Sequence, residues 1–520
     1  MTDAIIIGSG INSLVAAAHM QNKGWSVAIY EAADRPGGAV KTLELTEPGF
    51  KHDWAAMNLS LFAGSAFHQA NAETLAGHGL EFAPVAKPFA TAFPDGSWLG
   101  VTNDAEANAT RIAQVSGADS AVWRSLTDDF GTRAEAIFAI LGSPMGSGSL
   151  GGLFWKLLRK LKPAGVSDLG RFLLMSPRAW LDETFESDKV KAMLGAWGMH
   201  LDFAPDVAGG ALFPYLEGMA GQAFGMALGK GGAGGVTDAL VSLIQSRGGE
   251  IHCKARVAAV IHQKGKAKGI RLDSGQEVMA RKVVIANVSP SGLARLTGST
   301  GDARFDSKLA KFAHAPGTMM IHVALDEALD WTAGEELKQF AYIHLAPSLD
   351  QMARTYAQAK AGLLPDEPVI VVGQPTAVDP SRAPDGKHVL WLQVRMVPGE
   401  IKGDAAGTIS ETDWAIVAGP MAERAFDIIE RYAPGLRDKV IARRVVTPAE
   451  LEADNANLVG GDQVCGSHHL TQHFLFRPMR GHADGSTPIK NLHLTGAAVW
   501  PGGGTGAGPG YMLAQKLAGK

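Results

Sequence analysis

The sequence is poor in cysteine and has no long uninterrupted apolar run. Its 520 residues include two cysteines, Cys253 and Cys465, which lie far apart and form no C-x-x-C motif. A single chain segment therefore offers neither a dithiol redox centre nor a cysteine zinc site. No apolar stretch approaches the length needed to span a membrane. The chain also has no basic, apolar leader at its start, so we expect no signal peptide and a cytoplasmic protein.

The chain also lacks an excess of charge of either sign. Its formal net charge is −4 at pH 7, which gives no electrostatic reason to expect a nucleic-acid partner. A hydrophobic content of 46% with 19% charged residues is typical of a globular protein. The length is too great for one compact core, so we expect at least two domains. Glycine is abundant, at 63 residues, and it is concentrated at particular places.

The first glycine-rich place follows an apolar run at the start of the chain. Residues 5–7 are Ile-Ile-Ile, residues 8–13 read Gly-Ser-Gly-Ile-Asn-Ser, and residues 14–20 have helical composition. A second apolar run, residues 25–30, ends on Glu31. Strand, tight glycine turn, helix and a following acid form the pattern of a dinucleotide site, because the helix N-terminus binds phosphate and the acid binds ribose hydroxyls. Ser13 replaces the third glycine and is still small enough for close helix packing.

Two later segments supply the rest of such a fold. Gly229 to Gly235 leads into a helix, and strand-like pieces then follow between Glu250 and Ala286. The last segment has a short apolar strand that ends at Gly496, a glycine-rich turn and a terminal helix. We therefore predict an α/β fold in which a Rossmann-type dinucleotide-binding domain, an FAD-binding domain on the resemblance given below, is assembled from discontinuous segments, with an inserted α+β substrate domain. The predicted ranges are 1–60, 221–290 and 489–520 for the first domain, and 61–220, largely helical, with 291–488 for the second.

These motifs resemble those of a large FAD-dependent family. Glu31, Arg35 and Gly37-Gly38 are similar to its extended FAD signature, and residues 470–478, Leu-Thr-Gln-His-Phe-Leu-Phe-Arg-Pro, resemble a segment of its phytoene desaturase branch. The family includes phytoene desaturases, carotenoid isomerases and amine oxidases. The spacing is closest to the subgroup named for a pyridine nucleotide-disulphide oxidoreductase domain, although no redox dithiol is present here. Trp500 stands where that subgroup usually has a histidine.

The resemblance implies FAD as cofactor and a set of residues around it. We expect the following residues to bind it: Gly8, Gly10, Ile11, Asn12, Ser13, Glu31, Ala32, Arg35, Gly37, Gly38, Ala39, Ala55, Ala56, Met57, Val257, Asn287, Gly496, Gly504, Thr505 and Gly506. The catalytic candidates are His469, His473 and Arg477. A histidine titrates near neutral pH and could take a proton. The alternatives are that the histidines bond backbone in a turn and that Arg477 forms a structural salt bridge. We predict no metal site, because no carboxylate pattern accompanies the histidines.

Three functions stay open at this point. The first is an FAD-dependent dehydrogenase, desaturase or oxidase that transfers a hydride from an apolar or semi-polar organic substrate to the flavin. A carotenoid desaturase or isomerase is the alternative within this class. A GDI-like protein that binds a lipidated partner without catalysis is the alternative from another class. The electron acceptor, whether oxygen, quinone or nicotinamide, and the oligomeric state stay open too.

Residues 154–162, Phe-Trp-Lys-Leu-Leu-Arg-Lys-Leu-Lys, form an amphipathic pattern. Helical spacing places Phe154, Leu157, Leu158 and Leu161 on one face and basic residues on the other. One interpretation is a helix that contacts a membrane or a lipid-like substrate. The other is an ordinary amphipathic helix packed on its own domain.

Overall fold

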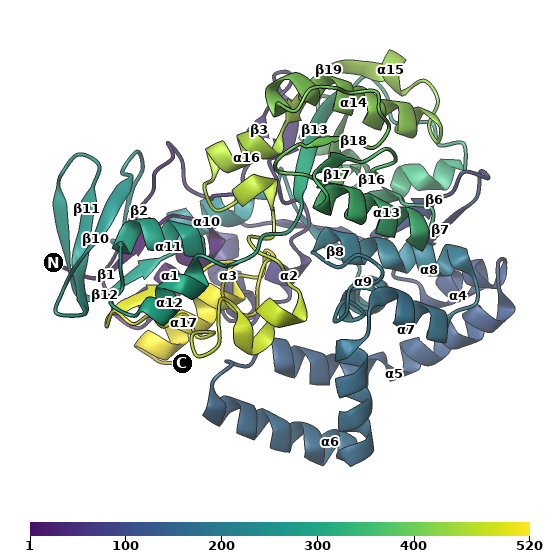
Figure 1. The fold of residues 1–520 in the computed structure, drawn as a ribbon. Helices are drawn as coiled ribbons and strands as arrows, with labels where there is room; N and C mark the ends of the chain where they lie inside the picture. The colour runs from purple at the N-terminus through teal and green to yellow at the C-terminus, as the bar shows by residue number, and fades with distance from the viewer.

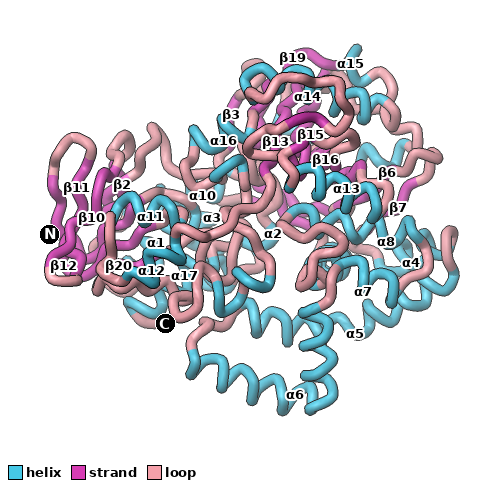
Figure 2. Tube along the Cα trace, in the orientation of Figure 1, coloured by secondary structure: helices cyan, strands magenta, loops and turns pink.

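The computed structural model describes residues 1–520, without the side chain of Ser147. It contains two seven-stranded sheets with helices around them, and Figure 1 shows the two sheets side by side above a helical region. Both termini lie beside the first sheet (Figure 2). Among the described residues, no helix is both long enough and apolar enough to cross a membrane.

The first sheet is centred on the N-terminal strand. Its members are β1 (Thr2–Ile7), β2 (Val27–Tyr30), β9 (Glu250–His252), β10 (Val257–Gln263), β11 (Lys266–Leu272), β12 (Glu277–Ala286) and β20 (Leu492–Leu494). Strand β1 runs parallel to β2 on one side and to β12 on the other, while β9 and β20 extend the parallel part. Strands β10, β11 and β12 form an antiparallel meander.

The alternation of side chains along β1 explains how this sheet is covered. Ala4 and Ile6 pack into one apolar cluster, and Ile5 and Ile7 pack into another on the opposite face. The first cluster includes residues of α1 (Ile11–Asn22), α10 (Gly234–Ser246) and α17 (Gly508–Ala518). The second includes the β10–β11 hairpin, α11 (Pro290–Thr297) and α12 (Ala303–Leu309). Parallel strands with both faces covered are typical of a Rossmann-type fold.

The second sheet has the order β19-β13-β17-β16-β14-β6-β7. The bounds are β6 (Phe89–Ala92), β7 (Trp98–Val101), β13 (Gly317–Leu325), β14 (Tyr342–Leu345), β16 (Val369–Gly373), β17 (His388–Val397) and β19 (Val440–Val446). Helix α14 (Trp414–Glu430) packs on one face through Val417, Met421 and Phe426. This helix starts at Trp414, where the Asp413 side chain caps it by accepting the Ala415 N–H.

Six α-helices and one 3₁₀-helix form the helical region. They are α4 (Ala105–Ala113), α5 (Gly117–Leu141), α6 (Ser147–Leu174), α7 (Pro177–Thr184), α8 (Asp188–Gly195), η1 (Ala196–His200) and α9 (Leu212–Phe224). Helix α6 bends sharply at Lys162, where φ is 60° and ψ is 171°, just before Pro163. The first arm, before the bend, contains the predicted amphipathic segment. The second arm, after the bend, leads toward α7 (Figure 1).

Shorter elements connect these parts. They are β3 (Thr42–Glu44), β4 (Lys51–Asp53), α2 (Ser60–Ala63), α3 (Ala66–Gly77), β5 (Phe82–Val85), β8 (Met226–Gly229), η2 (Glu335–Gln339), α13 (Leu349–Lys360), β15 (Leu363–Leu364), η3 (Pro375–Ala377), η4 (Pro380–Arg382), β18 (Gly403–Asp404), α15 (Leu436–Lys439), α16 (Pro448–Asp454), η5 (Val459–Gly461), η6 (Leu470–Gln472) and η7 (Phe474–Phe476). The first sheet draws its strands from three distant parts of the chain. The exact domain boundaries stay a prediction.

Candidate functional site

A cavity of about 650 Å³ lies where the central parallel strands of the first sheet end. Ligands bind at this edge of open α/β sheets because glycine turns and helix N-termini face it. Fifteen of the predicted cofactor residues line the cavity: Gly8, Gly10, Ile11, Asn12, Glu31, Ala32, Arg35, Gly37, Gly38, Ala39, Ala56, Val257, Asn287, Gly504 and Thr505. Residues from the start, middle and end of the chain therefore meet in one space.

The turn between β1 and α1 presents free backbone donors to this cavity. Gly8 has φ of +84°, and a Cβ at Gly10 would lie 3.1 Å from the Asn287 side-chain nitrogen. Gly10 is the N-cap of α1 and provides no side chain to cap it. Among the described residues, the N–H groups of Ile11 and Asn12 have no acceptor. Unpaired N–H groups and the helix dipole make this end of α1 suited to a phosphate group.

Glu31, at the end of β2, is fixed by the same turn. Its Oε2 accepts hydrogen bonds from the Ser9 backbone N–H at 2.7 Å and from the Ser9 hydroxyl at 2.6 Å, and its Oε1 accepts one from the Ala33 N–H at 2.8 Å. A carboxylate has about four acceptor positions, so one remains for a hydroxyl in the cavity. Sequence reasoning missed Ser9, although it lies between the two predicted glycines and itself lines the cavity.

Cations surround the wider part of the cavity. Arg35, Arg256 and Arg295 line it and are exposed. Lys41 also lines it, and its Nζ lies 2.6 Å from Asp454 and 4.8 Å from the centre of the Trp54 ring. Exposed guanidinium groups near a helix N-terminus favour an anionic ligand such as a diphosphate.

A segment assigned by sequence to the substrate domain forms another wall. Residues 453–458, together with Gln463 and Cys465, line the cavity. Asn457 joins this wall to the first sheet, because its side chain accepts the Ser289 N–H at 2.8 Å and donates to the Asn287 carbonyl at 3.2 Å. The cluster of asparagines before Gly460-Gly461 is the sequence signal that could have indicated these contacts.

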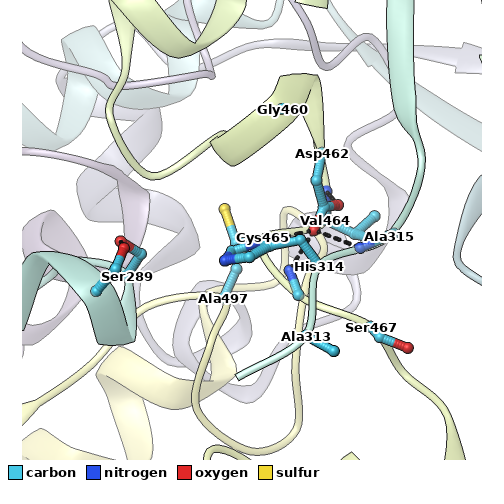
Figure 3. Close-up of polar contacts among 12 residues, drawn as sticks. Ser289, Ala313, His314, Ala315, Gly460, Asp462, Val464, Cys465, Ser467 and Ala497 are labelled. Carbon is cyan, nitrogen blue, oxygen red and sulfur yellow. Dashed lines mark hydrogen bonds and ion pairs between the residues drawn. The ribbon is translucent and has the colours of Figure 1, made fainter. Parts of the chain in front are cut away.

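Asp462 organises the loop that carries Cys465 (Figure 3). Its carboxylate is fully buried and accepts hydrogen bonds from the N–H groups of Gly466 at 2.6 Å, Ala315 at 3.0 Å and Val464 at 3.0 Å. The His314 ring lies 3.2 Å away. In Figure 3 the Cys465 sulfur points toward the side of Ser289, which also lines the cavity. Burial raises the pKa of the Cys465 thiol to about 12, so it stays protonated at neutral pH.

Five predicted cofactor residues lie behind the wall and do not line the cavity: Ser13, Ala55, Met57, Gly496 and Gly506. Ser13 is buried, and its hydroxyl accepts a hydrogen bond from Asn287 at 2.9 Å. A Cβ at Gly496 would lie 2.2 Å from the Asn287 side-chain oxygen, so this glycine permits the close approach of that side chain. Met57 is 1% exposed and packs toward Trp391. Direct contacts of these five residues with the cofactor stay a prediction.

His469 belongs to a hydrogen-bonded group. Its Nε2 lies 3.2 Å from Asp202 Oδ2 and 3.1 Å from the Tyr356 hydroxyl, and that hydroxyl donates to Asp202 Oδ1 at 2.9 Å. Asp202 is fully buried, and this burial raises its pKa, while the His469 side chain is 33% exposed. The same Nε2 also lies 2.9 Å from the Asp202 backbone carbonyl oxygen, so three contacts fix the orientation of the imidazole, and a histidine held in this way is a candidate for proton transfer. The sequence did not indicate Asp202 or Tyr356.

His473 and Arg477 are placed differently. His473 is 3% exposed, and its two ring nitrogens have no partner among the described residues. Burial lowers its pKa to about 3, so it is neutral at pH 7. Arg477 is fully buried and donates hydrogen bonds to the carbonyls of Ala497 at 2.7 Å and Ser467 at 2.8 Å. The expected alternative of a salt bridge is not formed, because backbone oxygens take its donors. Catalytic roles for both residues stay predictions, and this geometry favours structural roles.

Glu217, on α9, is an acidic residue that sequence reasoning missed. Burial raises the pKa of its carboxyl to about 7, and the residue is half-buried. It has no hydrogen-bond or ion-pair partner among the described residues.

Among those residues, no group of three or more His, Cys, Asp or Glu side chains could hold a metal ion.

Comparison with known proteins identifies the family of this chain. The model of the flavin containing amine oxidoreductase family matches residues 14–411, which is most of the chain. The chain belongs to this family. Pyridine nucleotide-disulfide oxidoreductase domain-containing protein 2 of Rattus norvegicus is 29% identical over 551 residues, which cover 99% of this chain and 92% of the relative. The neurosporene-forming phytoene desaturase of Cereibacter sphaeroides is 23% identical, with coverage of 99% and 94%.

Solved structures agree on the fold of this flavoprotein. An oxidoreductase from Methanosarcina mazei superposes with a TM-score of 0.62 at 17% identity, covering 99% of this chain and all of the other. The predicted family and Rossmann-type FAD-binding fold are therefore confirmed. The protein is an FAD-dependent oxidoreductase. The cavity fits that cofactor, because free N–H groups at α1, a fixed carboxylate at Glu31 and exposed arginines surround one continuous space.

Proposed function

We propose that this flavoprotein dehydrogenates an apolar or semi-polar organic substrate, with a carotenoid desaturase or isomerase as the alternative. Bound FAD supplies the hydride acceptor. The observation that carries the proposal is the cofactor cavity at the edge of the first sheet, together with a phytoene desaturase relative whose similarity covers 99% of this chain. Trp391, Tyr342 and Trp197 are 2–4% exposed and pack in the same apolar cluster as Met57, with ring centroids 5.7 and 6.2 Å apart. They form buried core packing and do not line the cavity.

The polar residues of the site would divide two tasks. We infer that the N–H groups of Ile11 and Asn12 hold the diphosphate and that Glu31 holds a ribose hydroxyl. Hydride loss in a desaturation is accompanied by loss of a proton. We infer that His469 accepts it; its ring is fixed by Asp202 and Tyr356 and lies outside the cavity lining. The phytoene desaturase relative supports a carotenoid-type substrate as the alternative.

Anaerobic bleaching of the flavin tests the substrate class. The FAD-loaded protein is mixed in detergent with phytoene, a long-chain alcohol, an aliphatic amine and a hydrophilic hydroxy acid. We expect bleaching with one or more of the apolar compounds and none with the hydroxy acid. Bleaching by the hydroxy acid alone would contradict the proposal. For the isomerase alternative, reduced protein should convert a cis-carotenoid to its trans form without consuming reductant.

His469→Gln tests the proton-handling role. The variant keeps a polar side chain of similar size but cannot take a proton, so we expect flavin reduction to slow by about 10²- to 10⁴-fold. The absorption spectrum of the bound flavin should stay unchanged. His473→Gln is the matched comparison on the same loop, and equal slowing in both variants would show a general structural effect.

A further inference from the structure

The first arm of α6 stands at the edge of the molecule. Figure 1 shows α6 below both sheets, and the bend at Lys162 joins its first arm to its second. One side is held by apolar contacts, because Leu157 is 8% exposed and packs in a cluster with Ile140 and Trp500. The arm is therefore fixed to the body of the protein, and its other side is free to meet a partner.

The outward side of this arm carries large apolar side chains. Phe154 is 52% exposed and Trp155 is 62% exposed. Phe138, at the end of α5, is 45% exposed, and it lines a hollow of about 380 Å³ together with Leu153 and Lys156 of α6. The sequence pattern placed Phe154 and Leu157 on one face, whereas in the structure Leu157 is buried and Phe154 is exposed. Adjacent exposed aromatic residues of this kind mark an interaction surface.

The same arm is strongly basic. Lys156, Arg159 and Lys162 are exposed and have no ion-pair partner among the described residues, whereas Lys160 pairs with Glu135 of α5. Residues 147–162 contain no aspartate or glutamate. The nearest acidic residue on α6 is Asp168, which lies beyond the bend. The arm thus presents three unpaired positive charges beside its aromatic residues.

We propose that the first arm of α6 docks this protein on a bilayer that contains anionic lipids. Phe154 and Trp155 enter the interface between headgroups and acyl chains, and the three cations bind lipid phosphates. Long Lys and Arg side chains can cover apolar surface and still reach the headgroups. Charge complementarity favours a lipid surface, because an anionic leaflet attracts each nearby cation. This inference concerns a surface outside the flavin cavity and does not depend on the substrate.

Vesicle sedimentation tests the proposal with the FAD-loaded full chain. Vesicles of phosphatidylcholine alone are compared with vesicles of phosphatidylcholine and phosphatidylglycerol. We expect the protein to sediment with the anionic vesicles and to be released by high salt, which screens the charges. Lys156→Gln, Arg159→Gln and Lys162→Gln should each lower the partition coefficient about fivefold, and together about a hundredfold.

A double variant and a control distinguish binding through this surface from nonspecific adsorption to vesicles. Phe154→Ser with Trp155→Ser should abolish vesicle binding, with the flavin spectrum unchanged. Ile416→Ser is the control, because Ile416 is 59% exposed on α14, at the other end of the molecule in Figure 1. Equal binding to neutral and anionic vesicles, no binding to either, or binding that survives both sets of α6 substitutions would overturn the proposal. If the double variant does not fold, the charge variants still decide it.

Discussion

Arg382 Nη2 lies 2.6 Å from Asp53 Oδ2, and both side chains are 1% exposed. The other Asp53 oxygen accepts hydrogen bonds from the Thr42 hydroxyl at 2.7 Å and the Ala233 N–H at 2.8 Å. One carboxylate therefore connects the hairpin after the nucleotide motif, the glycine-rich start of α10 and the loop before β17. The contacts of Asp53 therefore join two segments beside the first sheet to the loop that leads into β17 of the second sheet.

Loss of the arginine should destabilise the protein strongly. Arg382→Ala leaves the Asp53 charge buried without its partner, and we expect the free energy of unfolding to fall by about 3–5 kcal/mol. Urea unfolding followed by circular dichroism measures this change. Lys230→Ala breaks the exposed pair with Glu81 and serves as the control, with an expected effect of about 0–1 kcal/mol. Similar losses in the two variants would show that the buried pair has no special role.

Glu31→Ala should weaken FAD binding by about 1–3 kcal/mol. The substitution removes the acceptor for a cavity hydroxyl and also leaves the Ser9 N–H and hydroxyl without their partner. Ultrafiltration with titrated FAD gives the dissociation constant. Glu250→Ala, on the neighbouring strand β9 and outside the cavity lining, is the matched control. Unchanged FAD occupancy in Glu31→Ala would refute the ribose role.

The predicted residues that the structure brings together around the cavity are those whose geometry is local. Gly8, Gly10 and Glu31 lie within one strand, turn, helix and strand unit, so their spacing alone places them at one sheet edge. Asn457 could not be found this way, because it reaches the site through contacts with Asn287, 170 residues earlier. Asp202 was missed for the same reason, since it meets His469 from a position 267 residues away.

Other differences come from packing that overrides a local pattern. Helical spacing placed Phe154 with Leu157, yet only Leu157 packs against Ile140 of α5 and Trp500, and Phe154 stays exposed. Gly496 and Ser13 belong to recognised motifs, but they contact Asn287 and support the lining from behind.

Asp462→Asn should loosen one wall of the cavity. The Oδ2 atom that accepts the Gly466 and Ala315 N–H groups has no equivalent in one orientation of an amide, so at least one buried donor loses its partner. We expect the unfolding free energy to fall by about 1–3 kcal/mol per lost bond, together with weaker FAD retention. Asp404→Asn is the control, because Asp404 is equally buried in a network with Arg424 away from the cavity. It should affect stability but not FAD affinity.

Acidification should destabilise the protein partly through His473. Burial lowers its pKa to about 3 in the folded protein, while an unfolded histidine titrates near 6.5. Between these values the unfolded state binds a proton that the folded state does not, so this contribution to stability is complete above pH 6.5 and is lost as the pH falls toward 3. The loss is about 1.4 kcal/mol for each pH unit within the window.

His473→Phe removes this titration while keeping an aromatic ring against Trp500. Urea unfolding at several pH values between 6 and 4.5 should show a shallower fall in stability than in the wild-type protein, by about 1.4 kcal/mol for each pH unit. Phe474→Leu, next to it, changes packing without changing a titrating group, so it should lower stability by the same amount at every pH. An unchanged slope in His473→Phe would mean that this imidazole becomes charged in the folded protein, and a proton-transfer role for His473 would then regain support.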